Sequence, residues 1–246
     1  MQPDINDEID IMGILLDRVD YYKASQRIME FLESPGAKIV VTPNAEIIMA
    51  AQKNKKLKDA VNSADLSLPD GIGVVLASRL LGRPLEQRTT GFDLMMELLK
   101  MAADRKLSIF LLGGKPGVAE DAAKNIKKKF PGIRVAGTHH GYFDESGEEK
   151  VVGIINEASP DILFVAMGAP KQEIFMAKNR DKLRCRVAMG VGGSLDVLSG
   201  KVRRAPVFMQ RAGLEWLYRL ITQPSRFRRM SVLPLFLFNV IFRRGK

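Results

Sequence analysis

Asp70 stands in the tripeptide P-D-G, directly after the short apolar run LSL. A carboxylate held where a strand ends and a helix begins can act as a general base that takes a proton from a substrate hydroxyl. Pro-Asp-Gly is also a common turn sequence, so a plain turn is the competing interpretation. Asp70 is therefore a candidate catalytic base whose role depends on the residues that surround it.

Other polar side chains follow apolar runs in the same way. Thr42 and Asn44 follow KIVV, and Asn44 is also suited to cap the helix after it. Arg88 precedes a predicted helix in EQRTTGF, and an arginine there pairs either with an anion or with solvent. Gln172 lies in MGAPKQE, where an apolar run gives way to a proline suited to begin a helix. These side chains are candidates for binding a polar substrate.

Two glycine-rich turns, LLGGKPG and GVGGSLD, also follow apolar runs. Backbone N–H groups in such turns can approach a phosphate group closely. The second turn contains Gly192 and Gly193 and is followed by Asp196. Neither turn completes G-x-G-x-x-G and the chain has no G-x-x-x-x-G-K-[ST], so a dinucleotide enzyme and an ordinary P-loop ATPase are disfavoured.

The sequence supplies few metal ligands. Its two histidines, His139 and His140, are adjacent, its single cysteine is Cys185, and no D-x-D pair occurs. We therefore expect no metal and no cofactor, and phosphate charge would be met by arginine, backbone N–H groups and helix N-termini. A lone cysteine, which we interpret as core packing, forms no internal disulfide and favours a reducing cytoplasmic setting.

Apolar runs alternate with amphipathic stretches along most of the chain. The runs predict strands over 38–44, 107–114, 133–137, 161–168 and 186–193, and the stretches predict helices over 21–33, 91–105, 117–130 and 147–158. This alternation predicts an α/β fold with a mostly parallel, Rossmann-like sheet and helices on both faces. Ligands bind such sheets at the carboxyl ends of the strands, which is where the candidate residues fall.

The positive charge is concentrated in residues 200–246, here called the tail. The tail holds 11 Lys and Arg against one acid, while the first 199 residues hold 27 bases and 27 acids. We expect residues 1–199 to form the core and the tail to form a basic helical appendage, with one helix over 206–221. Its apolar segment VLPLFLFNVIF is too short to span a bilayer, but it suits the surface of an anionic membrane.

Two other interpretations of the tail stay open. A basic segment with Trp216 and Tyr218 can bind nucleic acid through phosphate contacts and base stacking, although the apolar segment suits lipid better and we expect no nucleic-acid partner. Alternatively, the apolar face of the tail is buried between subunits of a homo-oligomer. The acidic N-terminus lacks the features of a signal peptide, so we expect a cytoplasmic protein.

The segments TPNAE, PDG, RTTG, LLGGKPG, GYF, MGAPKQE and GVGGSLDVLSGKVRRAP resemble, in order and approximate spacing, the WecG/TagA/CpsF family of glycosyltransferases, above all its TagA type. The resemblance extends from about Ile9 into the tail. It implies an inverting, metal-independent transfer of N-acetylmannosamine from a UDP donor to N-acetylglucosamine on undecaprenyl diphosphate. The β-1,4 product belongs to wall teichoic acid synthesis at the inner face of the plasma membrane. Relatives use other UDP-sugars, including a uronic acid form, so another donor stays open.

The resemblance also implies roles for individual residues. Asp70 is the base that removes the proton from the acceptor hydroxyl. The other implied site residues contact the sugar, the uridine nucleotide or the leaving diphosphate. They are Thr42, Asn44, Arg88 and Gln172 at the sugar, Gly192, Gly193 and Asp196 at the nucleotide, and Arg219, Arg226 and Arg229 at the diphosphate.

Overall fold

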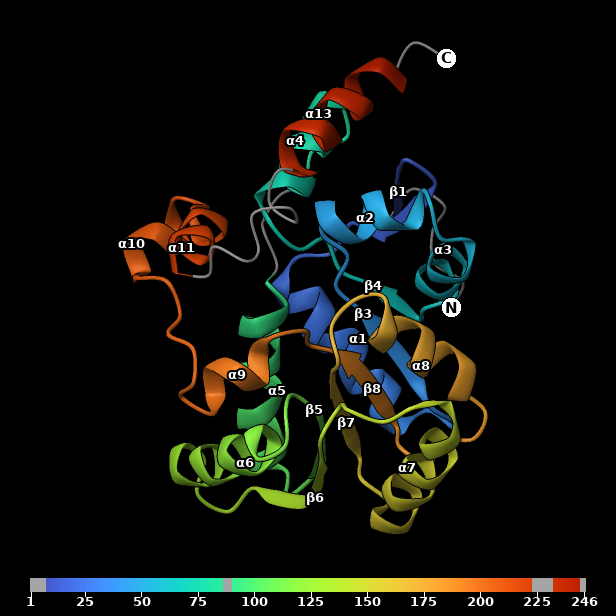
Figure 1. The fold of residues 1–246 in the computed structure, drawn as a ribbon, viewed down its shortest axis with the longest axis vertical. Helices are drawn as coiled ribbons and strands as arrows, with labels where there is room; N and C mark the ends of the chain where they lie inside the picture. Colours follow the sequence, from blue (N-terminus) through green and yellow to red (C-terminus); the bar gives the residue numbers. More distant parts are fainter. Residues whose placement is uncertain (1–7, 86–89, 223–231, 244–246) are drawn as a thin grey trace.

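The computed structural model describes residues 8–85, 90–222 and 232–243. The strands of its central sheet are β3 (Lys38–Val41), β4 (Leu66–Ser67), β5 (Ser108–Gly113), β6 (Arg134–His139), β7 (Ile162–Ala166) and β8 (Val187–Gly190). They are parallel and lie in the order β4-β3-β8-β7-β5-β6 (Figure 1). Every residue of β5, β7 and β8 is buried, so these strands occur in the sequence as continuous apolar runs.

Helices cover both faces of the sheet (Figure 1). One face carries α1 (Tyr21–Glu33), α5 (Gly91–Asp104) and α6 (Val118–Lys129). The opposite face carries α2 (Ala45–Ala51), α3 (Lys55–Asn62), α4 (Ile72–Leu80), α7 (Glu145–Ala158) and α8 (Lys171–Asn179). Successive residues of a strand point to opposite faces, so Phe164 packs with the first group and Leu163 with the second. The predicted α/β fold is confirmed.

An antiparallel hairpin of β1 (Glu8–Ile11) and β2 (Ile14–Asp17) was not among the predicted elements. Met12 and Gly13 form its turn with φ values of 59° and 78°, and a two-residue hairpin turn of this kind needs positive φ at both positions. Alternate side chains of β1 are buried. The period-two pattern in IDIMGILL therefore carried the signal for this hairpin.

The two-residue edge strand β4 leads directly to Asp70. Ser67 in this strand donates its backbone N–H to the carboxylate of buried Asp17 at 2.7 Å, so a side chain satisfies the free edge. Beyond the strand, the N–H of Asp70 donates to the carbonyl of Pro43 at 3.0 Å. The second bond holds the P-D-G turn against the T-P-N turn.

The chain beyond β8 forms α9 (Ser194–Leu198), α10 (Val207–Arg211), α11 (Glu215–Thr222) and α13 (Val232–Arg243). The prediction of one helix over 206–221 is wrong, because Gly213 has a φ of 71° and ends the helical hydrogen bonding between α10 and α11.

The helix α13 packs against α2 and α4, where it buries Phe236 and Val240 (Figure 1). Pro234 lies in its first turn, where a helix tolerates a missing N–H. None of the described helices combines the length and the apolar character needed to cross a membrane.

Gly113 ends β5 at a point where its backbone touches β7. Its φ is 138°, and a Cβ there would overlap the backbone carbonyl of Ala166. Gly113→Ala should lower the free energy of unfolding by about 2–3 kcal/mol, through backbone strain and the forced separation of the strands. Gly153→Ala is the control, because a Cβ at this position in α7 meets open space. This substitution should raise the free energy of unfolding by about 0.5–1 kcal/mol, since alanine favours a helix more than glycine does. Urea unfolding measures both, and a Gly113→Ala protein as stable as wild type would contradict the close contact.

Candidate active site

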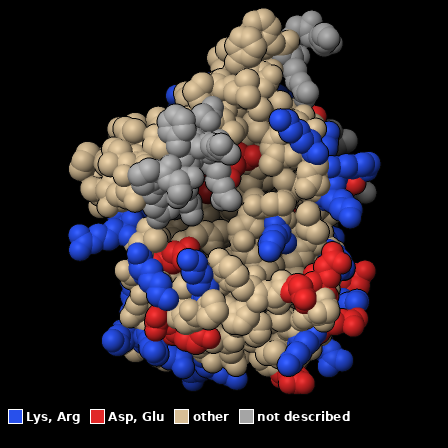
Figure 2. All heavy atoms as spheres, in the orientation of Figure 1, with Lys and Arg blue, Asp and Glu red and all other residues tan. Residues whose placement is uncertain are grey.

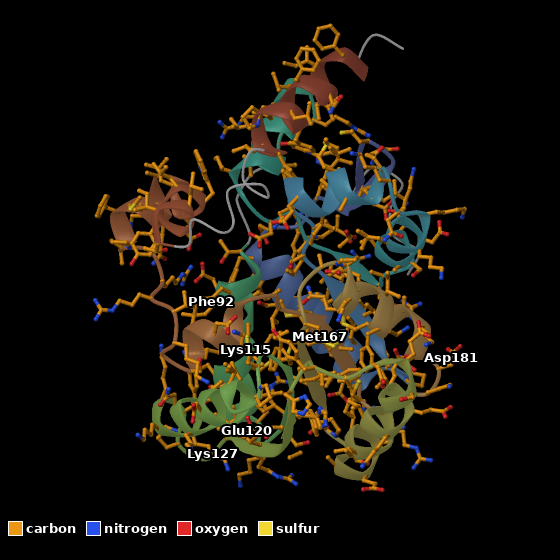
Figure 3. The ribbon with its side chains drawn as sticks, in the orientation of Figure 1. Phe92, Lys115, Glu120, Lys127, Met167 and Asp181 are labelled. Carbon is orange, nitrogen blue, oxygen red and sulfur yellow. The ribbon has the colours of Figure 1, made fainter. Side chains whose placement is uncertain are left out.

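A cleft of about 290 Å³ opens at the carboxyl ends of β3, β4, β7 and β8. The turns after these strands form one wall, and residues of α4, α5 and the tail form the others; Figure 3 shows Phe92 at the end of α5 that faces the tail helices. The predicted residues among its lining are Thr42, Asn44, Asp70, Gln172, Gly192 and Gly193. Residues from four separate turns thus meet in one space, as the topology of a parallel sheet requires.

The T-P-N turn is held by its own side chains. Asn44 caps α2, because its Oδ1 accepts a hydrogen bond from the N–H of Ile47 at 3.0 Å. The amide nitrogen of Asn44 is the donor that it can offer to a ligand. Thr42 is only 8% exposed, and its hydroxyl donates to the carbonyl of Gly190 at 3.4 Å. Asn44 can therefore contact a substrate directly, whereas Thr42 mainly positions the turn.

Gln172 joins two of the turns that form the cleft. Its Oε1 accepts hydrogen bonds from the N–H groups of Gly168 at 3.2 Å and Gly192 at 3.1 Å. Its Nε2 donates to the carboxylate of Glu173 at 2.8 Å, and the residue is 3% exposed. We expected this side chain to project toward a substrate. It lines the cleft, but its amide fastens the turns after β7 and β8 to each other.

Glu173 is a buried acid beside the cleft. The residue is 1% exposed, and its Oε2 has no hydrogen-bond partner among the described residues. Burial raises the pKa of its carboxyl above the ordinary value, and the hydrogen bond from Gln172 opposes this effect only in part. The hydrogen bond that Glu173 accepts fixes the orientation of the Gln172 amide.

Glu173→Gln tests the burial of this charge. A carboxyl whose pKa is raised on folding stabilises the protein below its ordinary pKa of 4.5, and this contribution is lost as the pH rises through the folded-state pKa. The variant should therefore be more stable than wild type near neutral pH, because glutamine places no charge in this buried position. The difference should vanish as the pH falls toward 4.5. Urea unfolding across this pH range measures it, and parallel pH profiles of the two proteins would contradict it.

Comparison with known proteins decides the family. The model described as the glycosyl transferase WecG/TagA/CpsF family matches residues 9–246. The chain belongs to this family. The chain is also similar to an N-acetylglucosaminyldiphosphoundecaprenol N-acetyl-beta-D-mannosaminyltransferase of Bacillus spizizenii, with 42% identity over 211 residues, 86% of this chain and 81% of the relative. A protein of the same name from Staphylococcus aureus is 35% identical over 235 residues, 95% of this chain and 92% of the relative. The resemblance found in the sequence is confirmed.

Arg204, which the sequence did not single out, lines the cleft of this WecG/TagA/CpsF glycosyltransferase. Its guanidinium donates to both carboxylate oxygens of Asp93, at 2.6 and 2.9 Å, and to Glu215 at 3.2 Å. The guanidinium also lies 4.4 Å from the ring centroid of Phe92. Arg204 thereby ties α11 to the first turn of α5. The matched motif KVRRAP contains this residue, but nothing in its spacing separates Arg203 from Arg204.

Arg204→Lys should loosen the docking of the tail while leaving the core intact. Lysine loses the two-point pairing with Asp93 and the planar contact with Phe92. For a partly exposed pair we expect a loss of about 1 kcal/mol, and therefore about fivefold faster proteolysis of the segment between α9 and α11. The control is Lys201→Ala, whose ion pair with Asp121 at 3.7 Å lies away from the cleft. Equal proteolysis of wild type and Arg204→Lys would contradict the tether.

The remaining predicted site residues fall into two groups. Asp196 lies in α9 and is not among the residues that line the cleft. Arg88, Arg226 and Arg229 lie outside the described residues, and Arg219 belongs to α11 with a side chain that is also outside them. The roles of these residues stay predictions.

The residues that the structure describes contain no cluster of side chains suited to bind a metal ion. No group of three or more His, Cys, Asp and Glu side chains that could hold a metal ion occurs in residues 8–85, 90–222 and 232–243. His139 and His140 contact each other, with ring centroids 4.5 Å apart. Cys185 is buried, as expected, and burial raises the pKa of its thiol to about 12, so it stays protonated and unreactive.

The charge on the walls of the cleft is mostly negative. Among the described lining residues, Glu46, Asp70 and Glu215 are acids and Arg204 is the base. Figure 2 shows acidic side chains inside the hollow between the core and the tail. The guanidinium of Arg204 is already paired with two carboxylates. An anionic substrate would therefore need further positive charge from other parts of the chain.

Proposed function

We propose that this chain transfers N-acetylmannosamine from a UDP donor to N-acetylglucosamine on undecaprenyl diphosphate, in the synthesis of the wall teichoic acid linkage unit. The supporting observation is the position of Asp70, at a strand end and in the same cleft as Asn44 and the turns containing Gly168 and Gly192. The relatives' names supply the mannosaminyl group and the lipid-linked acceptor.

In the proposed reaction Asp70 is the general base. It accepts the proton of the acceptor 4-hydroxyl as that oxygen forms a bond to the anomeric carbon of the donor sugar. The bond from this carbon to the diphosphate oxygen breaks, and its electron pair leaves with UDP. Attack from the face opposite UDP inverts the anomeric centre and gives the β-1,4 linkage. The base and the groups that stabilise the leaving diphosphate must therefore stand on opposite sides of the sugar.

We infer that arginines, and not a divalent ion, stabilise the leaving diphosphate. The described walls of the cleft carry more acids than bases, and a diphosphate adds further negative charge. The tail carries the whole net charge of +10 and contains Arg219, Arg226 and Arg229. Arginine pairs with phosphate oxygens through two parallel hydrogen bonds and is suited to this task. Together with Arg88, these residues are the proposed source of the missing charge.

We also infer that the tail binds the inner face of the plasma membrane. In α13, Leu235, Phe238, Ile241 and Phe242 are each more than half exposed. An apolar face flanked by basic residues favours binding to anionic lipid over binding to nucleic acid. Each Lys or Arg close to the membrane surface contributes about 1 kcal/mol to the binding free energy. Sedimentation with phosphatidylglycerol vesicles tests this, and Phe238→Asp should weaken the binding. Tighter binding to RNA than to vesicles would favour the nucleic-acid interpretation instead.

The experiment for the proposed function follows UDP release in the presence of EDTA, with the lipid-linked N-acetylglucosamine acceptor. Wild type should turn over UDP-N-acetylmannosamine, and the Arg226→Ala/Arg229→Ala double variant should lose activity about 100-fold or more. Turnover with another UDP-sugar alone would keep the transferase class and reject the donor. Activity that disappears in EDTA and returns with Mg²⁺ would reject the metal-independent mechanism.

A further inference from the structure

The first turn of α4, directly after Asp70, lies between two helices of the tail. A Cβ at Gly213, next to the start of α11, would lie 3.2 Å from the side chain of Ile72. A Cβ at Gly73 would lie 2.5 Å from Leu233, near the start of α13. The absence of side chains at these two glycines lets both tail helices approach α4 closely. The tail therefore enters the cleft beside the proposed base.

Both polar and apolar groups line the cleft. The polar groups include Asn44, Asp70 and the glycine turns after β7 and β8. One set of apolar side chains comes from α4, α11 and α13, and its members are Ile72, Trp216, Val232 and Leu233. The sugar and the diphosphate of a donor are held by hydrogen bonds, which the aliphatic members of this set cannot supply, so the set suits an apolar part of a substrate.

Part of this apolar set continues onto the outside of the molecule. Val232 lines the cleft at the start of α13, and the exposed residues Leu235 and Phe238 follow it at three-residue spacing, so the three share one side of the helix. Figure 1 shows α13 running beside α4 to one end of the molecule. Apolar side chains therefore connect the cleft with the helix face that we propose to lie on the membrane.

We propose that Ile72, Trp216, Val232 and Leu233 form a groove for the first isoprene units of the acceptor lipid. This inference rests on the proposed acceptor, whose attacking hydroxyl must reach Asp70. Only one sugar and one diphosphate separate that hydroxyl from the hydrocarbon chain. The first isoprene units therefore begin close to the cleft, and the exposed face of α13 leads the rest of the chain toward the bilayer. Burial of these units against the groove stabilises the bound acceptor.

Two soluble acceptors test the groove without any membrane or detergent. Both are N-acetylglucosamine diphosphate esters, one with an ethyl group and one with a citronellyl group of two isoprene units, used below micellar concentrations. For wild type, kcat/KM should be at least about tenfold higher with the citronellyl ester, mainly through KM. Trp216→Ala should reduce this ratio to about one to three. Phe208→Ala is the control, because this aromatic residue of the tail is 70% exposed and does not line the cleft.

Trp216 is the single tryptophan of the chain, so its fluorescence reports on the groove independently of catalysis. Citronellyl diphosphate should shift the emission of the wild-type protein to shorter wavelength, and inorganic diphosphate at the same concentration should not. If both esters are turned over with equal kcat/KM, or if Trp216→Ala leaves the ratio of the two kcat/KM values unchanged, the proposed groove is rejected and the proposed function stands.

If neither ester is turned over but the spectral shift occurs, the groove is supported and the proposed reaction is rejected. If the shift does not occur, the groove is rejected whatever the kinetics show.

Discussion

Asp70→Asn should lower kcat about 10²–10⁴-fold, because asparagine keeps the size of the side chain but cannot take the proton of the acceptor hydroxyl. The backbone bond from residue 70 to the carbonyl of Pro43 does not depend on the carboxylate, so the turn should keep its shape. We expect the free energy of unfolding to change by about 1 kcal/mol or less. The KM for the donor should change little, since the base acts mainly in the transition state.

The matched control for Asp70 is Glu46, the acid of the cleft that lies in the first turn of α2. Glu46→Gln removes one negative charge from the same space and should reduce kcat less than about tenfold. Steady-state UDP release by wild type, Asp70→Asn and Glu46→Gln gives the three kcat values, and their comparison distinguishes loss of the base from loss of a negative charge. An Asp70→Asn protein within tenfold of wild type, or an equal loss in Glu46→Gln, would reject Asp70 as the base.

Gln172→Leu should have a large effect on both stability and activity. Leucine has a similar volume but leaves the N–H groups of Gly168 and Gly192 without their shared acceptor, and it leaves Glu173 without its donor. Unpaired buried polar groups cost about 1–3 kcal/mol each, so the free energy of unfolding should fall by about 3–5 kcal/mol. The two turns line the cleft, and their displacement should lower kcat/KM about 100-fold.

Gln52→Leu is the control for this variant. Gln52 is partly buried, whereas Gln172 is fully buried, and Gln52 donates hydrogen bonds to the carbonyls of Met12 and Ile48 outside the cleft. Its replacement should cost about 1 kcal/mol and leave activity unchanged, because no turn of the site depends on it. Urea unfolding and UDP release measure both effects. If Gln172→Leu were no more harmful than Gln52→Leu, the amide of Gln172 would not be what joins the two turns.

Much of the fold could be predicted because parallel strands are buried on both sides. The continuous apolar runs that form β5, β7 and β8 are as short as buried strands, and a glycine follows each within two residues, which favours a strand over a buried helix. In open α/β sheets, ligands bind at the carboxyl ends of the strands, and this rule predicted that Asn44, Asp70 and Gln172 would lie close together there. The cap at Asn44 also followed from sequence, since it depends only on local backbone geometry.

Contacts between distant segments could not be predicted in this way. The pairing of Arg204 with Asp93 joins residues that are far apart in the sequence, and neither residue has a local pattern that marks it. The inward fold of Gln172 depends on two glycine N–H groups from different turns. The helix break at Gly213 could not be predicted because the helical sequence pattern continues on both sides of this residue. At the break, Gly213 lies close to Ile72, which is distant in the sequence.

The packing of α13 on α2 and α4 has a consequence for biosynthesis. The ribosome makes α2 and α4 early, but the partners that cover them, Phe236 and Val240, emerge only after the whole sheet has been translated. Domains otherwise begin to fold from their N-terminal side during synthesis. A nascent or prematurely terminated chain therefore displays an uncovered apolar surface that chaperones and proteases can recognise. Only copies translated through α13 bury this surface, so incomplete chains should be removed before they compete for the proposed lipid-linked acceptor.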